Sequence, residues 1–225
     1  LGMDTEQIEA LGIKPIQDEM QKIENIQTHG QILKQIQHFH QYSIGSLFQL
    51  GASADAKNSD MVIAQLSQGG LGMSDRDYYL NQDERSKKIR SAYQDYVTTL
   101  FTLAGDTEEK ASEKAQTIME METRLAKASM TRLERRDPHK TYHKMELGEI
   151  QELCPGINWE GYFAGLNIEL PEEINVRQPA FFEEIGQMLS EVPLDHWKTY
   201  FEWNLLNSSA SYLSEDFVNA SFEFY

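Results

Sequence analysis

The sequence predicts a mainly α-helical domain that carries a small β-hairpin at about residues 46–67. Over most of the chain, apolar residues recur at spacings of three and four, which is the period of a helix with one buried face. One segment instead shows two strand-like runs around a polar turn. With 225 residues, 40% of them hydrophobic, the chain is long enough to build a sizeable core.

The two clearest helices lie in the middle of the chain. The apolar period runs from residue 85 to residue 104, and Gly105 then suits a helix end. A second helix is expected from about residue 107 to residue 128, where "TEEK" supplies an acid-rich first turn. The expected buried positions are Ile89, Tyr93, Tyr96, Leu100 and Leu103 in the first helix, and Ala111, Ala115, Ile118 and Leu125 in the second.

Further helices are predicted nearer the two ends of the chain, at residues 14–27, 30–43, 178–192 and 193–214. Prolines stand close to the start of several of them, a position that a helix tolerates. The last two carry bulky apolar stripes, which pack in cores far more often than they bind ligands. These stripes are assigned to the core: Phe181, Phe182, Trp197, Phe201 and Leu205.

The strand-like segment is "SLFQLGASADAKNSDMVIAQLS". Residues 46–54 and 60–67 flank the polar turn "DAKNS", the arrangement typical of a β-hairpin. The glycines that follow, in "GGLGMSDRDYYL", do not form a phosphate-binding loop. That motif needs a lysine and a hydroxyl residue opening a helix, and neither follows these glycines.

Composition and charge exclude several classes of function. The chain has 36 acidic and 20 basic residues, a net charge of −16, which argues against a nucleic-acid partner. No stretch is apolar enough to span a membrane. The single cysteine, Cys154, excludes an internal disulfide and is interpreted as a small buried residue. The start of the chain has no export signal. Because the chain begins with Leu1 rather than methionine, we expect it to be part of a longer protein, about whose targeting the missing signal says nothing.

Two histidines in "DPHKTYHKM" raise the question of zinc. His139 and His143 are four apart, and on a helix they would share one face, as in the zinc-peptidase motif. That motif places a glutamate directly after the first histidine, whereas this chain has Lys140, which cannot accept a proton from water and would repel a dication. Pro138 favours a turn here. We therefore interpret the pair as surface histidines.

Four stretches resemble the N-terminal half of neprilysin-like zinc metallopeptidases, in the order and at the spacing of that family. They are "ASADAKNSDMVIAQLSQ", "GGLGMSDRDYYL", "RDPHKTYHKM" and "LSEDFVNASFEFY". The resemblance runs from about Met3 to Tyr225, and within the family it is strongest to the bacterial oligopeptidase O branch.

The resemblance implies a fold, and it implies which half of the protein contains the catalytic residues. The family cleaves peptides in a closed chamber, with a zinc ion held by a His-Glu-x-x-His helix and a downstream glutamate. Those residues belong to the C-terminal half, and no His-Glu pair occurs in this chain. Residues 1–225 are therefore expected to form the helical cap, or lid, domain of a zinc metalloendopeptidase, without a catalytic residue or zinc ligand of their own. The arginine with which the family grips a substrate carboxylate is expected upstream of Leu1.

In "SDRDYYL" we expect structural roles rather than substrate contact. One of its first two residues would cap a turn, and Arg76 would bridge Asp75 and Asp77. Tyr78 and Tyr79 would bury their rings and hydrogen-bond their hydroxyls.

Residues of two other motif stretches are also expected to have structural roles rather than to contact substrate. Residues Arg136, Asp137 and Pro138 would form a turn, with Tyr142 in a supporting role. In the closing stretch, four residues are expected to pack in the interior rather than to bind substrate: Phe217, Ala220, Phe222 and Tyr225.

The expected partners are oligopeptide substrates and the catalytic domain of the same protein. Apolar surface that such a domain would normally cover favours a homodimer of the isolated chain. One cysteine, in a family whose animal members are disulfide-rich, favours a bacterial origin, with a cell-envelope or secreted location preferred and a cytoplasmic one left open. The alternative is a helical interaction module with no enzymatic parentage, which would use exposed aromatic residues such as Trp197 or Trp203.

Overall fold

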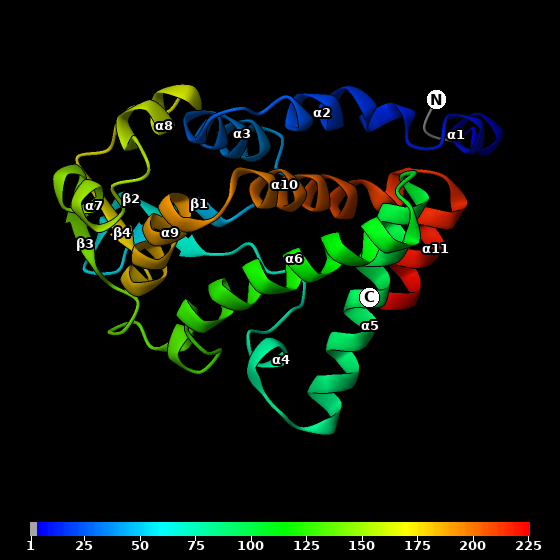
Figure 1. Ribbon diagram of the computed structural model, residues 1–225. Helices are drawn as coiled ribbons and strands as arrows, with labels where there is room; N and C mark the ends of the chain where they lie inside the picture. Colours follow the sequence, from blue (N-terminus) through cyan, green and yellow to red (C-terminus); the bar gives the residue numbers. More distant parts are fainter. Residues whose placement is uncertain (1–3) are drawn as a thin grey trace. The chain divides into compact units, whose positions relative to one another are not determined.

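The computed structural model describes residues 4–225, so Met3, where the resemblance begins, lies outside the described residues. The chain forms two compact units, each described here by itself (Figure 1). The first contains residues 4–27, 81–121 and 193–225, and the second contains residues 28–80 and 122–192.

The described part of the first unit is helical. Its elements are α1 (Thr5–Leu11), α2 (Lys14–Glu24), α5 (Glu84–Leu103), the first part of α6 (Glu108–Ala128), α10 (Leu194–Ser209), a 3-10 turn (Ala210–Tyr212) and α11 (Glu215–Phe224). Asp83 caps α5 by accepting a hydrogen bond from Ser86 N at 3.0 Å. Gly105 ends the helix region at φ 107°, where glycine is favoured. The helices predicted from periodicity are thus confirmed.

Aromatic rings build the core of the first unit. Trp203 makes edge contacts with Tyr93 and Tyr96, with ring centroids 5.7 and 5.6 Å away. Burial raises the pKa of Tyr96 to about 12, and its hydroxyl donates to Asn207 Oδ1 at 2.8 Å. Trp203 is 1% exposed and Trp197 is fully buried. The idea that these tryptophans form an exposed interaction surface is therefore wrong.

The last helix turns a different face inward from the one expected. Phe217 is buried as predicted, but Phe222 is 86% exposed, so its assignment to packing is wrong. Phe224 takes its place and stacks on Tyr96 with ring centroids 4.9 Å apart. Positions 217 and 224 are two helical turns apart and share one face, whereas position 222 points away from it. Tyr225 is 66% exposed and only its edge meets Tyr96.

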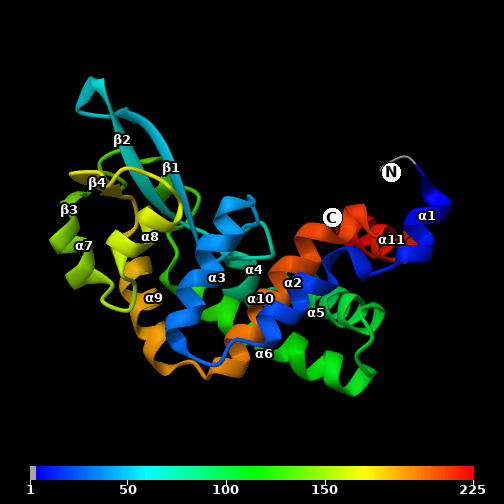
Figure 2. The same ribbon diagram turned by 90° about the horizontal axis from the view of Figure 1, so that it is seen from above.

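The second unit contains a small mixed sheet. Strands β1 (Phe48–Asp55) and β2 (Asn58–Gln68) form the predicted hairpin, and the strand order is β1-β2-β4-β3, with β4 (Glu173–Val176) parallel to β2 and antiparallel to β3 (Lys144–Glu146). Strand β4 pairs only with Ala64, Gln65 and Leu66 of β2, so the hairpin tip runs on beyond the sheet (Figure 2). The hairpin prediction is confirmed, and the two short strands are additional to it.

Helices pack around this sheet within the second unit. They are α3 (His29–Gln41), α4 (Asp77–Leu80), the end of α6, a 3-10 turn η1 (Glu134–Arg136), α7 (Leu147–Leu153), α8 (Trp159–Gly165) and α9 (Pro179–Glu191). Phe48, at the start of β1, meets Trp159, Tyr162 and Phe182, with centroid distances of 5.4–5.7 Å. Cys154 is fully buried, as expected, and burial raises its pKa to about 12.

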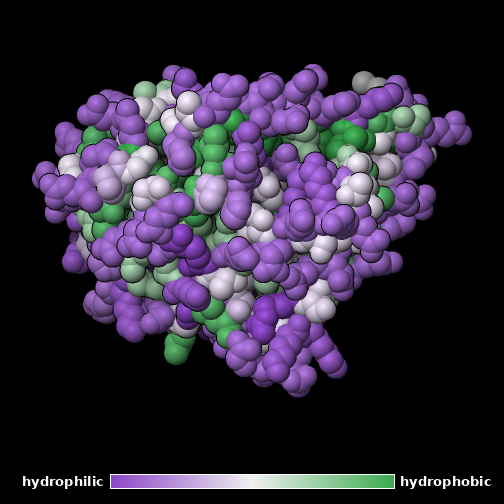
Figure 3. All heavy atoms as spheres, in the orientation of Figure 1, coloured by the Kyte–Doolittle hydropathy of each residue, from purple (hydrophilic) through white to green (hydrophobic). Residues whose placement is uncertain are grey.

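The surface agrees with the acidic composition. On the face drawn in Figure 3, hydrophilic residues predominate and hydrophobic ones show in scattered patches. Across residues 4–225, no helix has both the length and the apolar character required to span a membrane.

Candidate functional site

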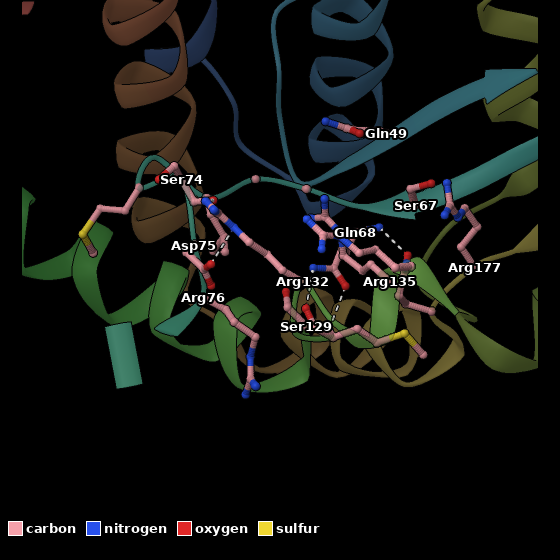
Figure 4. Close-up of a pocket in the computed structure, with 17 residues that line it drawn as sticks. Gln49, Ser67, Gln68, Ser74, Asp75, Arg76, Ser129, Arg132, Arg135 and Arg177 are labelled. Carbon is pink, nitrogen blue, oxygen red and sulfur yellow. Dashed lines mark hydrogen bonds and ion pairs between the residues drawn. The ribbon is translucent and has the colours of Figure 1, made fainter. Parts of the chain in front are cut away.

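A cavity of about 570 Å³ lies in the second unit, and the motif stretches "GGLGMSDRDYYL" and "RDPHKTYHKM" both contribute to its wall (Figure 4). Its lining comes from the end of β2, the glycine-rich segment, the connection after α6 and the residues that follow β4. The lining residues are Gln49, Ser67, Gln68, Gly69, Gly70, Leu71, Met73, Ser74, Asp75, Arg76, Ser129, Met130, Arg132, Arg135, Arg136, Arg177 and Gln178.

The sheet brings two of these segments together. Strands β2 and β4 run parallel, and their pairing ends with Leu66 opposite Val176. The next residues, Ser67 and Arg177, therefore lie at the same end of this pairing, where Ser67 is still paired with Gln49 of β1. Arg177 N donates to Leu66 O at 2.9 Å, and Figure 4 shows the Arg177 side chain beside Ser67. Polar groups at this end of the pairing thus open onto the cavity.

Two glutamine side chains fix the connection after α6 to the sheet. Gln68 makes both amide hydrogen bonds to Met130: its Nε2 donates to Met130 O at 3.2 Å, and its Oε1 accepts from Met130 N at 2.8 Å. Gln178, only 3% exposed, accepts from Gln68 N at 2.9 Å. Gly69 follows, and a Cβ there would lie 3.2 Å from Phe48 Cα. The wall is therefore held by hydrogen bonds between glutamine side chains and the backbone, and a side chain at position 69 would crowd the start of β1.

The cavity is strongly basic, although the chain as a whole is acidic. Five arginines and one carboxylate, that of Asp75, line it. Arg132 Nε lies 2.6 Å from Asp75 Oδ2 and compensates that charge. Arg76 Nε donates to Ala126 O at 2.9 Å, and its Nη1 lies 4.0 Å from Asp77 Oδ1.

The other three arginines have no acidic partner. Within residues 4–225, Arg135, Arg136 and Arg177 form no ion pair with a carboxylate. Guanidinium groups bind carboxylates and phosphates through paired hydrogen bonds, and they keep their charge at any physiological pH. The arrangement can therefore bind an anion.

The first motif differs from expectation in its ion pairs. Asp75 does cap a turn, since its Oδ1 accepts from Asp77 N at 3.0 Å. Arg76 does not bridge the two aspartates, because Arg132 from a distant segment occupies Asp75. Tyr79 is 4% exposed, and its hydroxyl accepts from Met73 N at 2.8 Å and donates to Glu122 Oε2 at 2.6 Å.

The partner tyrosine, Tyr78, is only half-buried, so the expectation that both rings lie in the interior is wrong for it. Side chains at neighbouring positions of the short helix α4 point about 100° apart, and here only Tyr79 faces inward.

The second motif forms a turn followed by an extended segment. Asp137 Oδ1 accepts from His139 N at 2.9 Å, and Asp137 O accepts from Lys140 N at 3.1 Å. The Tyr142 hydroxyl donates to Asp55 Oδ1 at 2.9 Å, next to the hairpin turn. Pro138 is exposed within the turn, while Arg136, just before it, faces the cavity. The structural role assigned to this motif stays a proposal.

The histidine pair does not form a metal site. His139 lies exposed in the turn, and His143 lies in the extended segment before β3, so the shared helix face does not exist. His143 is half-buried rather than a surface residue, with its Nδ1 buried and unpaired. Among residues 4–225, no group of three or more histidine, cysteine, aspartate or glutamate side chains is placed to hold a metal ion. The residues described here do not fit a zinc site.

Sequence reasoning missed most of the cavity. Arg132, Arg135, Arg177 and the two glutamines come from segments far apart in the chain, and no motif unites them. One signal was readable: "TRLERR", residues 131–136, holds three arginines in an otherwise acidic chain.

Comparisons with known proteins agree with the fold. The model for "Peptidase family M13" matches residues 1–225. Human endothelin-converting enzyme 1 is 31% identical over 236 aligned residues, covering 99% of this chain and 30% of that protein. The zinc metalloprotease ZMP1 of Mycobacterium tuberculosis superposes with a TM-score of 0.92 at 25% identity, covering 100% of this chain and 34% of that one. PEPO from Lactobacillus rhamnosis, at 15% identity, shares the fold with a TM-score of 0.80, over 99% of this chain and 35% of its own. The chain thus spans about a third of the length of these relatives.

Proposed function

This chain belongs to peptidase family M13, as part of its N-terminal domain, and from that membership we propose that it is the substrate-restricting lid of a zinc metalloendopeptidase that hydrolyses oligopeptides. The observation that carries the proposal is the family match over residues 1–225. The likeness to a solved zinc metalloprotease of the family supports it.

In this proposal, chemistry and access are divided between two parts of the enzyme. A zinc ion bound in a catalytic domain outside this chain would lower the pKa of a water molecule and polarise the scissile carbonyl. Residues 4–225 supply no fitting set of metal ligands. The contribution of this chain is to limit entry to short peptides and to exclude bulk water during the reaction, the role of a gating element.

The proposed partners are oligopeptide substrates and the catalytic domain. The exposed face of α11 offers apolar surface, with Val218, Phe222 and Tyr225 each at least 37% exposed. We expect this surface to pair two copies of the isolated chain as a homodimer. A strictly monomeric mass by light scattering at high concentration would count against it.

The finer placement, in the bacterial oligopeptidase O branch, is also a proposal. Its support is the resemblance of the motif stretches to that branch, and the single cysteine, Cys154, supports a bacterial origin. The alternative of an interaction module with no enzymatic parentage is wrong, because the whole chain matches a peptidase family.

Two measurements test the proposed function. The purified chain, incubated with short synthetic peptides and zinc, should neither cleave them nor retain stoichiometric zinc after dialysis. The parent enzyme should cleave the same peptides free in solution but spare their sequence inside a folded protein. Chelator-sensitive cleavage by the isolated chain, or equal cleavage of the folded protein, would contradict the assignment.

A further inference from the structure

We propose that the arginine-lined cavity of the second unit binds carboxylate-rich peptide segments, so that the enzyme favours acidic oligopeptides. The groups that would make these contacts are the guanidinium groups of Arg135, Arg136 and Arg177. The inference rests on the proposed function, because peptides are the relevant ligands only if the chain serves a peptidase.

The charges of the side chains that line the cavity are the first reason to expect an anionic ligand. Of six charged side chains that line it, five are arginines, and the one carboxylate, Asp75, is bound to Arg132 at 2.6 Å. The chain has 36 acidic residues against 20 basic ones, so acidic neighbours are abundant elsewhere in it. Three arginines without an acidic partner in one cavity therefore create a local positive potential that attracts anions.

Two acidic residues flank Arg135 and Arg136 in the sequence, and neither lines the cavity. Asp137 follows Arg136, and its Oδ1 accepts from His139 N at 2.9 Å. Glu134 precedes Arg135 in the 3-10 turn. Its Oε2 accepts from Thr131 N at 2.9 Å and from Thr131 Oγ1 at 2.8 Å, and these hydrogen bonds hold its pKa below the ordinary value. The same bonds fix the turn that carries Arg135 and Arg136. Both arginines are thus held in place without being neutralised.

The part of the wall that carries Arg177 is also fixed. Arg177 follows β4 directly, and its backbone nitrogen is bonded to β2. The amide of Gln68 is bonded to Met130 through both of its polar atoms, and Gln178 is buried against it. A ligand would therefore meet a preformed wall and would order only the exposed ends of the arginine side chains.

The volume argues for several carboxylates rather than one. A cavity of about 570 Å³ is far larger than a single carboxylate requires and lies in the range of sites that hold ligands of several residues. Three uncompensated guanidinium groups suit two or three acidic side chains spaced along an extended peptide. Free inorganic phosphate would use the same hydrogen-bonding chemistry, so the experiment includes it as a separate ligand.

The test is a binding titration with the 225-residue chain. A fluorescent peptide with three consecutive glutamates is compared with the same peptide carrying glutamines, and inorganic phosphate is titrated separately. We expect the glutamate peptide to bind at least about tenfold more tightly, since the loss of one charged hydrogen bond costs more than the ~1.4 kcal/mol that corresponds to a factor of ten. Binding should weaken as salt is added.

Variants of the chain test whether the peptide binds at the cavity arginines. The double change Arg135→Gln with Arg177→Gln should weaken binding of the glutamate peptide at least about tenfold. The control Arg85→Gln removes one positive charge from an exposed position of α5 that makes no ion pair among the described residues, and it should change affinity less than about twofold. Circular dichroism and the unfolding midpoint verify that each variant is folded. If the double variant does not fold, the binding titration is repeated with the single variant Arg177→Gln.

Three outcomes would overturn the inference. One is equal binding of the glutamate and glutamine peptides. Another is equal weakening by Arg85→Gln, which would indicate a diffuse charge effect. The last is cavity-dependent binding of phosphate with no binding of the acidic peptide. Failure here is distinct from failure of the proposed function, because an enzyme that cleaves short peptides without any preference for acidic ones would refute only this inference.

Discussion

Each unit of the molecule contains a cluster of charged side chains, and the two clusters are built in opposite ways. In the first unit, Lys114 Nζ lies 2.7 Å from both Asp106 Oδ2 and Glu202 Oε2, and the three side chains are 14–16% exposed. In the second unit, Arg135 and Arg177 face a cavity and have no acidic partner among residues 4–225. Charges paired inside a unit hold its helices together, whereas charges left unpaired remain available to a ligand.

The pKa of Asp106 illustrates the first kind of cluster. Burial acts to raise it, but hydrogen bonds from Lys110 and Lys114 outweigh burial and hold the pKa below its ordinary value. The folded state therefore gains stability from this carboxylate at neutral pH and loses it as the pH falls through the lowered pKa.

The largest expected effect comes from breaking the paired cluster. Lys114→Met should lower the free energy of unfolding by about 2 kcal/mol, because Glu202 would stay largely buried after losing Lys114, and Asp106 would keep only Lys110 as a cationic partner. Urea unfolding followed by circular dichroism measures this. Arg135→Gln, which also removes one positive charge, is the matched control. Equal losses in the two variants would refute the contrast between paired and unpaired cations.

The buried hydrogen bonds of one tyrosine in the second unit should come next. Tyr79→Phe removes the hydroxyl that accepts from Met73 N and donates to Glu122, and should cost about 1–2 kcal/mol of unfolding free energy. Tyr212, which is 78% exposed, provides the control: Tyr212→Phe should leave the urea midpoint unchanged. A loss at Tyr212 as large as that at Tyr79 would show that burial does not decide the cost.

A pH effect of intermediate size is expected at His40. Burial lowers its pKa below 6.5, with hydrogen bonds to the backbone of Ser46 and Phe48 opposing part of the shift. Its Nδ1 lies 2.6 Å from the Tyr162 hydroxyl, which suits a neutral ring. Because the unfolded chain takes up the proton more readily, stability is full above the unfolded pKa and falls as the pH drops toward the folded one.

The measurement is the unfolding free energy of the wild type and of His40→Gln at neutral and at mildly acidic pH. The wild type should lose more stability on acidification than the variant does, and the difference should be smaller than the loss caused by Tyr79→Phe. His139→Gln, at an exposed turn position, should follow the wild type. If His40→Gln loses as much unfolding free energy on acidification as the wild type does, the role of His40 is refuted.

The smallest effect on stability is expected at the unpaired cavity arginines. Arg136→Gln should change the unfolding free energy by less than about 0.5 kcal/mol, because no ion pair is lost. Thermal unfolding at low salt is the sensitive measurement, since a fall in mutual repulsion among the arginines would raise the midpoint slightly. A clear destabilisation would mean that the cavity arginines stabilise the fold rather than remain available to bind a ligand.

Local periodicity predicted the parts of this fold that depend on local sequence. The buried face of α6, with Ala111, Ala115, Ile118 and Leu125, is the one read from the spacing, and all four are at most 2% exposed. Strands β3 and β4, with three and four residues, are too short to show alternation. They form because β2 of the hairpin offers an edge to β4, and β4 in turn offers one to β3. Phe222 and Phe224 are two positions apart, and the tertiary fold decides that Phe224, which is half-buried, packs against Tyr96 while Phe222 is exposed.

The candidate site was less predictable for the same reason. The ion pair of Arg132 with Asp75 joins residues far apart in the chain, so the nearer Arg76 was the natural but wrong partner for Asp75 to infer. The His139 and His143 spacing predicted a shared face only if the segment were helical, and Asp137 folds it into a turn instead. What the sequence did contain was an excess of arginine at residues 131–136, without any sign of what surrounds it.

The most direct measurement is an NMR titration that follows the Nε–H signals of the arginine side chains while the glutamate peptide is added to the chain. Arg124 lies in the same unit and is paired with Glu184 at 2.6 Å and Glu191 at 3.0 Å, so it is an internal reference for a paired arginine. We expect the signals of Arg135, Arg136 and Arg177 to shift together in one saturable step, while the signal of Arg124 stays in place. Shifts of equal size at Arg124, or none at the cavity arginines, would contradict it.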